Sequence, residues 1–202
     1  MGEGKVSPQS AVRSPPTPEL LDKLIAACAL ALTAPLVAVA MVAIRLESRG
    51  PAIFRQRRVG RDGELFDLYK LRTMAVGSDR GPDVALSQGD PRITRSGALL
   101  RRYSLDELPN LVNVLRGEMA IVGPRPTIPS QVERYSGHQR RRLEVKPGLT
   151  GWAVVNGRVS LSWPERIELD IWYVDHRSLW LDLRILAKTF WLLVSGHGLY
   201  SG

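Results

Sequence analysis

An uncharged stretch of 21 residues limits what this chain can fold into more than any other feature. Residues 24–44, LIAACALALTAPLVAVAMVAI, contain no acidic or basic side chain. As a helix, at about 1.5 Å per residue, they would be roughly 30 Å long, which matches the apolar core of a bilayer. A cleaved secretory signal is the competing interpretation, but its apolar region usually has about 7–15 residues and follows a more strongly charged start. We therefore predict a membrane segment.

Pro35 lies near the midpoint of this stretch. Proline removes a backbone donor and clashes with the preceding turn, so we expect a kink there, with Thr33 satisfying part of the backbone that proline leaves unpaired. A kinked helix could cross the membrane with the basic flank that begins at Arg45 in the cytoplasm. Alternatively, two limbs of about ten residues, each about 15 Å long, could enter and return on one side. These residues leave both topologies open.

The rest of the chain divides into a tail and a basic body. Residues 1–19 are rich in Pro, Ser and Gly and have almost no large apolar side chains, so we expect a disordered tail. The membrane segment would cover residues 20–48, and residues 49–202 would form a mixed α/β domain. The 202-residue chain carries a formal charge of +8, which indicates an anionic partner: nucleic acid, an anionic membrane surface or a phosphorylated substrate. The single cysteine excludes an internal disulfide and a cysteine-rich zinc site.

Alternation and turn signals predict a β-hairpin followed by several helices. The hairpin would turn at Asp62-Gly63. Residues 74–92 are typical of a loop, and residues 93–119 favour helix, interrupted near Pro109 and ending near Gly117. Four apolar residues of that region are spaced to face a core: Leu108, Leu111, Val112 and Leu115.

The C-terminal region is amphipathic. Residues 163–176 have helical spacing, and residues 178–198 place five large apolar side chains on one side of a helix: Trp180, Leu183, Leu186, Phe190 and Trp191. Such a helix could lie in a membrane interface or pack onto the core, and the pattern leaves both open.

Two adjacent carboxylates, Asp106 and Glu107, permit two interpretations. With Ser104 they match the S-x-x-E capping box, in which both carboxylates would belong to the first turn of a helix. However, a helix that began there would place Pro109 in its interior. A helix that begins at Pro109 avoids this conflict and leaves both carboxylates in front of it, free to face a site.

Several basic residues stand on or beside predicted turns and element ends, where they could grip phosphate. These are Lys70, Arg72, Arg101, Arg102, Arg125, Lys146 and Arg158. Each could instead be solvated surface charge. Carboxylates among many cations favour a metal-bridged phosphate substrate, with an aspartate as metal ligand or nucleophile. No P-loop or GxGxxG pattern accompanies them.

Four motifs follow the proline-interrupted segment in order. They read FRQRRVGRDGELFDLYKLRTM, DPRITRSGALLRRYSLDELPNLVNVLRGEMAIVGPRP, VKPGLTGWAVVNGR and ELDIWYVDH. Together they resemble the bacterial sugar transferase family, the monotopic phosphoglycosyl transferases, over about residues 20–193. The resemblance implies transfer of a sugar phosphate from a UDP-sugar to a polyprenyl phosphate, usually undecaprenyl phosphate, with release of UMP. This would be the first membrane step of bacterial glycan assembly, on the cytoplasmic face of the inner membrane.

The resemblance also implies roles for individual residues. Asp106 would attack the β-phosphorus and form a phosphosugar-aspartyl ester, which the lipid phosphate then displaces. Mg²⁺ is required, with Asp106, Glu107 and Asp170 as the expected ligands. Arg125 would hold a phosphate, and Lys70 and Arg72 would line the site.

The same resemblance implies a helix-rich α+β fold. Pro35 would bend a re-entrant membrane helix, so that both of its ends are cytoplasmic. Interfacial amphipathic helices and a homodimer are further expectations.

Two positions depart from the family pattern. Val154 stands where the family has glutamine, and Ala34 stands where serine is common before the proline. The transferred sugar is not readable from the chain. A membrane-tethered nucleic-acid-binding protein and a structural scaffold are the alternatives. The nucleic-acid-binding alternative does not explain the acidic dyad, and the sequence lacks interleaved aromatic platforms or a helix-turn-helix. A scaffold would need no divalent metal and no hydrolysis-sensitive intermediate.

Overall fold

One long helix carries the apolar segment. In the computed structural model, which describes residues 18–78, 90–157 and 160–195, helix α1 spans Glu19–Glu47 and continues through Pro35. The Thr33 hydroxyl donates to the Ala29 carbonyl at 2.7 Å. The expectation for Thr33 is therefore wrong in detail, because the carbonyl that Pro35 leaves without its usual donor belongs to Ala31, four residues before the proline.

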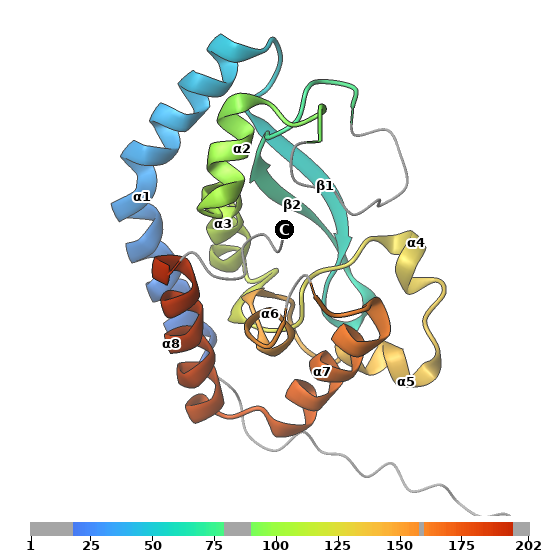
Figure 1. The fold of residues 1–202 in the computed structure, drawn as a ribbon. Coiled ribbons are helices and arrows are strands. Elements are labelled where there is room, and N and C mark those ends of the chain that lie inside the picture. Colours follow the sequence, from blue (N-terminus) through green and yellow to red (C-terminus); the bar gives the residue numbers. More distant parts are fainter. Residues whose placement is uncertain (1–17, 79–89, 158–159, 196–202) are drawn as a thin grey trace, which may run out of the picture.

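Most of the α1 surface does not contact the rest of the protein. Only 11% of its most apolar 18-residue window is buried, and among the described residues α1 is the one helix long and apolar enough to cross a membrane. One face packs against helices α2 (Arg95–Arg102) and α3 (Asn110–Leu115), through Ala26, Ala40 and Ile44 (Figure 1). A soluble core helix would bury far more of such a surface.

The predicted hairpin is confirmed. Strands β1 (Ile53–Val59) and β2 (Leu65–Leu71) pair antiparallel, with Val59 opposite Leu65 beside the turn. The turn η1 (Arg61–Gly63) places Asp62 at φ 55° and Gly63 at φ 86°. Aspartate and glycine tolerate these left-handed angles better than most residues, which is why the Asp-Gly pair signalled the turn.

Helices α2 and α3 form a layer between α1 and the hairpin (Figure 1). Gly97 lets α2 approach the end of the hairpin closely, because a Cβ atom at this position would lie 2.1 Å from the Thr73 carbonyl oxygen. Between the two helices the chain forms the short 3-10 turn η2 (Leu105–Glu107). Helix α3 ends at Leu115, and Gly117 follows at φ 78°, so the predicted interruption and end of the helical region are confirmed.

The second half of the chain adds a small parallel sheet and short helices before two longer ones. Strand β3 (Ala120–Val122) pairs with β4 (Gly148–Thr150). The remaining elements are α4 (Pro129–Val132), α5 (Gly137–Arg140), η3 (Arg141–Leu143), α6 (Trp152–Val155), α7 (Trp163–His176) and α8 (Leu179–Ser195). The fold is therefore helix-rich α/β, as expected.

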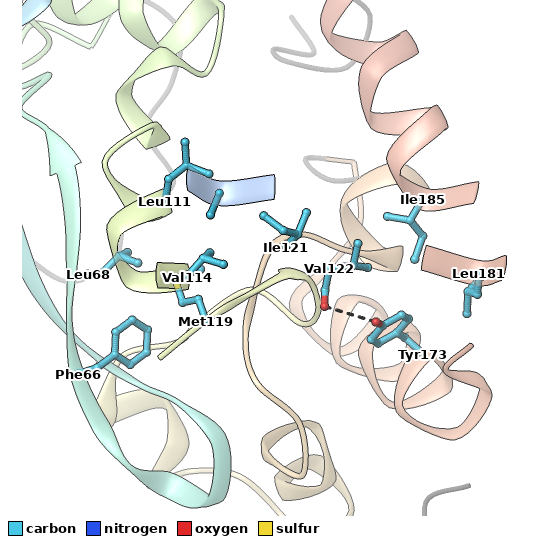
Figure 2. Packing of buried hydrophobic residues seen from close by; sticks show 11 residues of the cluster. Phe66, Leu68, Leu111, Val114, Met119, Ile121, Val122, Tyr173, Leu181 and Ile185 are labelled. Atoms are coloured by element: carbon cyan, nitrogen blue, oxygen red, sulfur yellow. Dashed lines mark hydrogen bonds between the residues drawn. The ribbon is translucent and has the colours of Figure 1, made fainter. Parts of the chain in front are cut away.

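The main core joins all these layers (Figure 2). It contains Ala26, Phe66, Leu68, Leu111, Val114, Met119, Ile121, Val122, Tyr173, Leu181 and Ile185. Leu108 and Leu115 pack against it as predicted, but Val114 rather than Val112 is buried. The Tyr173 hydroxyl donates to Asp182 Oδ1 at 2.7 Å, so this buried phenol has a partner.

Helix α8 has one buried face and one exposed apolar face. Leu181 and Ile185 lie in the core, whereas Trp180, Phe190 and Trp191 are exposed over most of their surface. Of the five predicted apolar residues, only Leu186 packs against the core. Core packing therefore accounts for one side of this helix and leaves the aromatic side uncovered.

Arg72 stabilises the end of α1. Its buried guanidinium donates to the carbonyl oxygens of Ser48 and Arg49, both at 2.8 Å, and to Ile44 at 3.4 Å. The last carbonyls of a helix have no intrahelical donor, and Arg72 supplies one. Arg72, which was predicted to bind substrate phosphate, therefore has both terminal nitrogens bonded at the end of α1 and is not among the cations that act on Asp106.

Candidate active site

The acidic dyad stands in front of a helix rather than inside one. Ser104 adopts a left-handed conformation (φ 53°, ψ 23°), its side chain forms no capping bond, and Asp106 and Glu107 occupy the 3-10 turn η2. Helix α3 begins at Asn110, directly after Pro109. The capping-box interpretation is therefore wrong, and the alternative start at Pro109 is confirmed to within one residue. A left-handed serine costs about 1–2 kcal/mol, a strain that this turn retains.

Glu107 joins two cations from distant parts of the chain. Its Oε1 accepts from Lys70 Nζ at 2.9 Å and from Arg125 Nη2 at 2.7 Å. Only 13% of the Glu107 side chain is exposed, whereas Arg125 is about half exposed. The charge of Glu107 raises the pKa of Arg125, and burial lowers the pKa of Lys70. Lys70, Arg101 and Arg125 outnumber the two carboxylates of the dyad, so the cluster has a net positive charge that can attract a phosphate.

Asp106 is the uncommitted member of the dyad. Within the described residues it has no hydrogen bond or ion pair. Burial raises its pKa, and the neighbouring Glu107 raises it further, while Lys70, Arg101 and Arg125 oppose the change. A carboxylate with no donor on its oxygens is available as a nucleophile or as a metal ligand.

The predicted phosphate-binding cations divide into two groups. Lys70, Arg101 and Arg125 lie around the dyad, and Arg101 Nε donates to Thr73 Oγ1 at 2.8 Å. Lys146 does not join them, because its ammonium pairs with Glu19 Oε2 at 2.8 Å at the start of α1. Arg158 lies outside the described residues.

Asp170 belongs to a different set of contacts. It is buried in α7 and pairs with Arg142 Nη2 at 2.5 Å. Burial raises the pKa of Asp170 to about 6, and the attraction of Arg142 opposes this. In the described part of the chain, no three carboxylate, histidine or cysteine side chains come together to hold a metal ion. Among the described residues, Asp170 therefore pairs with Arg142 and does not join Asp106 and Glu107, its expected partners at a metal ion.

The arrangement can be compared with known proteins. The sequence pattern of the bacterial sugar transferases matches residues 15–196. This chain belongs to the bacterial sugar transferase family.

Several relatives of this chain carry names that state an activity. The chain is 47% identical over 191 residues to a UDP-glucose:undecaprenyl-phosphate glucose-1-phosphate transferase of Caulobacter vibrioides, covering 90% of this chain and 71% of that protein. It is 40% identical over 177 residues to an Escherichia coli protein of the same name, covering 83% of this chain and 38% of that protein.

A third relative is the uncharacterized sugar transferase EpsL of Bacillus subtilis. It is 42% identical over 180 residues, which cover 89% of this chain and 88% of EpsL. Family membership favours a transferase over the nucleic-acid-binding alternative.

Asn110 is a residue of this sugar transferase that reasoning from charged motifs missed. It is 3% exposed, and its Oδ1 has no hydrogen-bond partner among the described residues. It borders a cavity of about 10 Å³ together with Lys70, Glu107 and Arg125, room for about one water molecule or ion. A buried acceptor without a donor is costly, which suggests that it serves something that enters this site. Its position four residues after Asp106 was the available signal.

Asn113 provides the contrast within the same helix. It is 0% exposed, accepts from the Tyr69 backbone N–H at 3.2 Å, and donates to Asp67 O and Glu118 Oε2, both at 2.7 Å. Two of these bonds join α3 to strand β2 and the third reaches Glu118 in the loop after α3, so the role of this amide is structural.

We predict that the two asparagines differ in what they contribute to stability. Asn113→Leu should destabilise the fold by about 2–4 kcal/mol, because it leaves Tyr69, Asp67 and Glu118 unpaired. Asn110→Leu should cost less than about 1 kcal/mol, since it removes an acceptor that has no donor. Thermal unfolding of both variants in detergent would measure this, and equal losses would show that Asn110 is also structural.

Proposed function

We propose that this sugar transferase moves a sugar phosphate from a UDP-sugar to undecaprenyl phosphate and releases UMP, as the initiating step of bacterial polysaccharide assembly. One observation carries the proposal: Asp106 has no hydrogen bond among the described residues, and it stands beside Glu107, which binds both Lys70 and Arg125. The names of the Caulobacter and Escherichia coli relatives support the same reaction.

The proposed chemistry has two displacements at one phosphorus. A carboxylate oxygen of Asp106 attacks the β-phosphorus, the bond to the α,β-bridging oxygen breaks, and UMP leaves with that electron pair. An oxygen of undecaprenyl phosphate then attacks the same phosphorus, and the Asp106–phosphorus bond breaks to regenerate the carboxylate. Lys70 and Arg125 neutralise charge on the phosphoryl oxygens, and Glu107 holds both cations in position.

The site has oxygen donors that fit a Mg²⁺ ion. Asp106 has no partner among the described residues and Asn110 Oδ1 is an unpaired acceptor, and carboxylate and amide oxygens are ligands that Mg²⁺ prefers. We propose Asp106 and Asn110 as ligands, while Glu107 stays with its two cations. When bound, Mg²⁺ would neutralise charge on the diphosphate and the departing UMP.

The apolar surfaces support a membrane location. We propose that α1 enters the cytoplasmic membrane as a re-entrant helix bent at Pro35, with residues 49–202 on the cytoplasmic face. The exposed apolar sides of α1 and α8 would then be covered by lipid, and both helices contribute to one core cluster through Ala26, Leu181 and Ile185. This places the dyad at the surface where a lipid phosphate meets a soluble nucleotide sugar.

One prediction of the proposed function concerns the reaction itself. With Mg²⁺ and one accepted UDP-sugar, the purified protein should release about one equivalent of UMP without lipid and turn over only after undecaprenyl phosphate is added. Asp106→Asn should abolish both, and EDTA should suppress turnover. Asp175→Asn, which removes an exposed partner of Arg141, is the matched control and should retain activity. Turnover by the Asp106→Asn protein would contradict the covalent mechanism.

A second prediction concerns topology. In a Cys28→Ser background, Leu20→Cys and Leu46→Cys would place single thiols at exposed positions near the two ends of α1. A membrane-impermeant maleimide added to intact cells should label neither, and should label both once the membrane is opened, because both ends lie inside. Labelling of the Leu20→Cys protein in intact cells would instead indicate a helix that crosses the bilayer.

A third prediction concerns pH. Asp106 must be ionised to attack, so kcat/KM should fall as the pH drops through its raised pKa. Lys70→Met removes a cation that favours the carboxylate, so the acid limb should move to higher pH. Glu107→Gln removes a like charge, so the limb should move to lower pH. Lys146→Met, whose partner is Glu19, should not move it, and shifts of equal sign in the first two variants would contradict this account.

A further inference from the structure

The GPRP turn (residues 123–126), which carries Arg125, is fixed by hydrogen bonds to its backbone carbonyl groups. The carbonyl groups of its last three residues and of the next residue each accept a hydrogen bond from a different donor. The pairs are Gly148 N to Pro124 O at 2.9 Å, Arg142 Nη2 to Arg125 O at 3.0 Å, Arg58 Nη1 to Pro126 O at 3.2 Å, and Val59 N to Thr127 O at 2.8 Å. The turn therefore has no free carbonyl between Pro124 and Thr127.

The two prolines add to this constraint. Pro124 and Pro126 flank Arg125, and each ring restricts its own φ to about −65°. With the backbone restricted on both sides, the remaining freedom lies mainly in the long Arg125 side chain. That side chain must lie within 2.7 Å of Glu107 for the observed pair, so the position of its backbone matters.

Arg142 is the unusual donor among the four, because it is a buried charge. The residue is 3% exposed. Its guanidinium donates to the Tyr135 hydroxyl at 2.6 Å, to Asp170 Oδ2 at 2.5 Å and to the Arg125 carbonyl, and it lies over the ring of Trp163. The neighbouring Arg141 instead forms surface pairs with Asp175 and Glu144.

Stability alone is a poor reason to bury such a pair. Removing two charges from water costs several kcal/mol per ion, and apolar residues of similar volume often serve stability equally well. What the buried pair contributes here is a fixed, directional donor to one carbonyl, that of the residue whose side chain faces the dyad.

We propose that Arg142, neutralised by Asp170, is a positioning residue of the active site: it holds the backbone of Arg125 so that the guanidinium meets Glu107 beside Lys70. Asp170, expected from sequence to bind metal, takes this supporting role instead. The inference rests on the proposed function only for the role of Arg125 on substrate phosphate.

A double-mutant cycle tests this action through Arg125. Arg125→Ala, Arg142→Met and their combination would be compared by UMP release, at a temperature where all are folded. We expect Arg142→Met alone to lower kcat/KM by about tenfold or more, mainly through kcat, and to have little further effect in the Arg125→Ala background. Arg141→Met is the matched control and should remain within about twofold of wild type.

Several outcomes would overturn the proposal. An equal loss from Arg142→Met in both backgrounds would mean that it acts independently of Arg125. If Arg142→Met does not fold, Arg142→Lys is the second variant. It keeps a charge opposite Asp170 but loses the two separate guanidinium nitrogens that reach Tyr135 and Arg125, and it should show the same pattern. If Arg142→Lys does not lower kcat/KM, or lowers it equally in the Arg125→Ala background, the proposal would also be overturned.

A readout without catalysis separates this proposal from the proposed reaction. The backbone amides of Gly148 and Val59 donate to the turn, so hydrogen exchange at these amides reports its local opening. Exchange should accelerate in Arg142→Met and stay unchanged in Arg141→Met. Unchanged exchange in Arg142→Met would overturn the positioning role, even if the wild-type protein releases UMP normally. If exchange accelerates in Arg142→Met but the wild-type protein releases no UMP, the result would count against the proposed reaction alone.

Discussion

The candidate site depends on one carboxylate, Glu107, that binds two cations at once. Lys70 comes from the hairpin and Arg125 from the turn after β3, and a single oxygen of Glu107 accepts from both. A largely buried carboxylate requires such partners, and Lys70, which is also mostly buried, requires it in return. The pairing therefore ties the hairpin, the dyad and the GPRP turn together, and it leaves Asp106 without a hydrogen-bond partner among the described residues.

The buried and the exposed arginines of this protein bind different groups. Arg72 and Arg142 are buried and donate to backbone carbonyls, of the α1 end and of the GPRP turn respectively. Arg125 is half exposed and its guanidinium faces the dyad. The two buried arginines thus stabilise the backbone, whereas we propose that the half-exposed Arg125 binds substrate phosphate.

Local signals were sufficient for much of the fold and for the dyad. Asp62-Gly63 marked the hairpin because few residues accept left-handed angles, and Pro109 marked the start of α3 because proline is favoured at the start of a helix. Arg72, Lys146 and Asp170 each bind a partner distant in the chain, and no local pattern predicts such a partner. Asn110 was missed because its spacing from Asp106 was a weak signal, whereas its unpaired Oδ1 among the described residues becomes visible only in the folded structure.

By itself, the sequence determined the long apolar helix, the hairpin and the place of Asp106-Glu107 before α3. These features follow from hydrophobic composition and from backbone angles, which act over a few neighbouring residues. Only the tertiary structure decided which cations serve the dyad, because Glu107 meets Lys70 across 37 residues and Arg125 across 18. Such pairs form when packing brings their backbones together, so the choice among many similar arginines and lysines belongs to the fold as a whole.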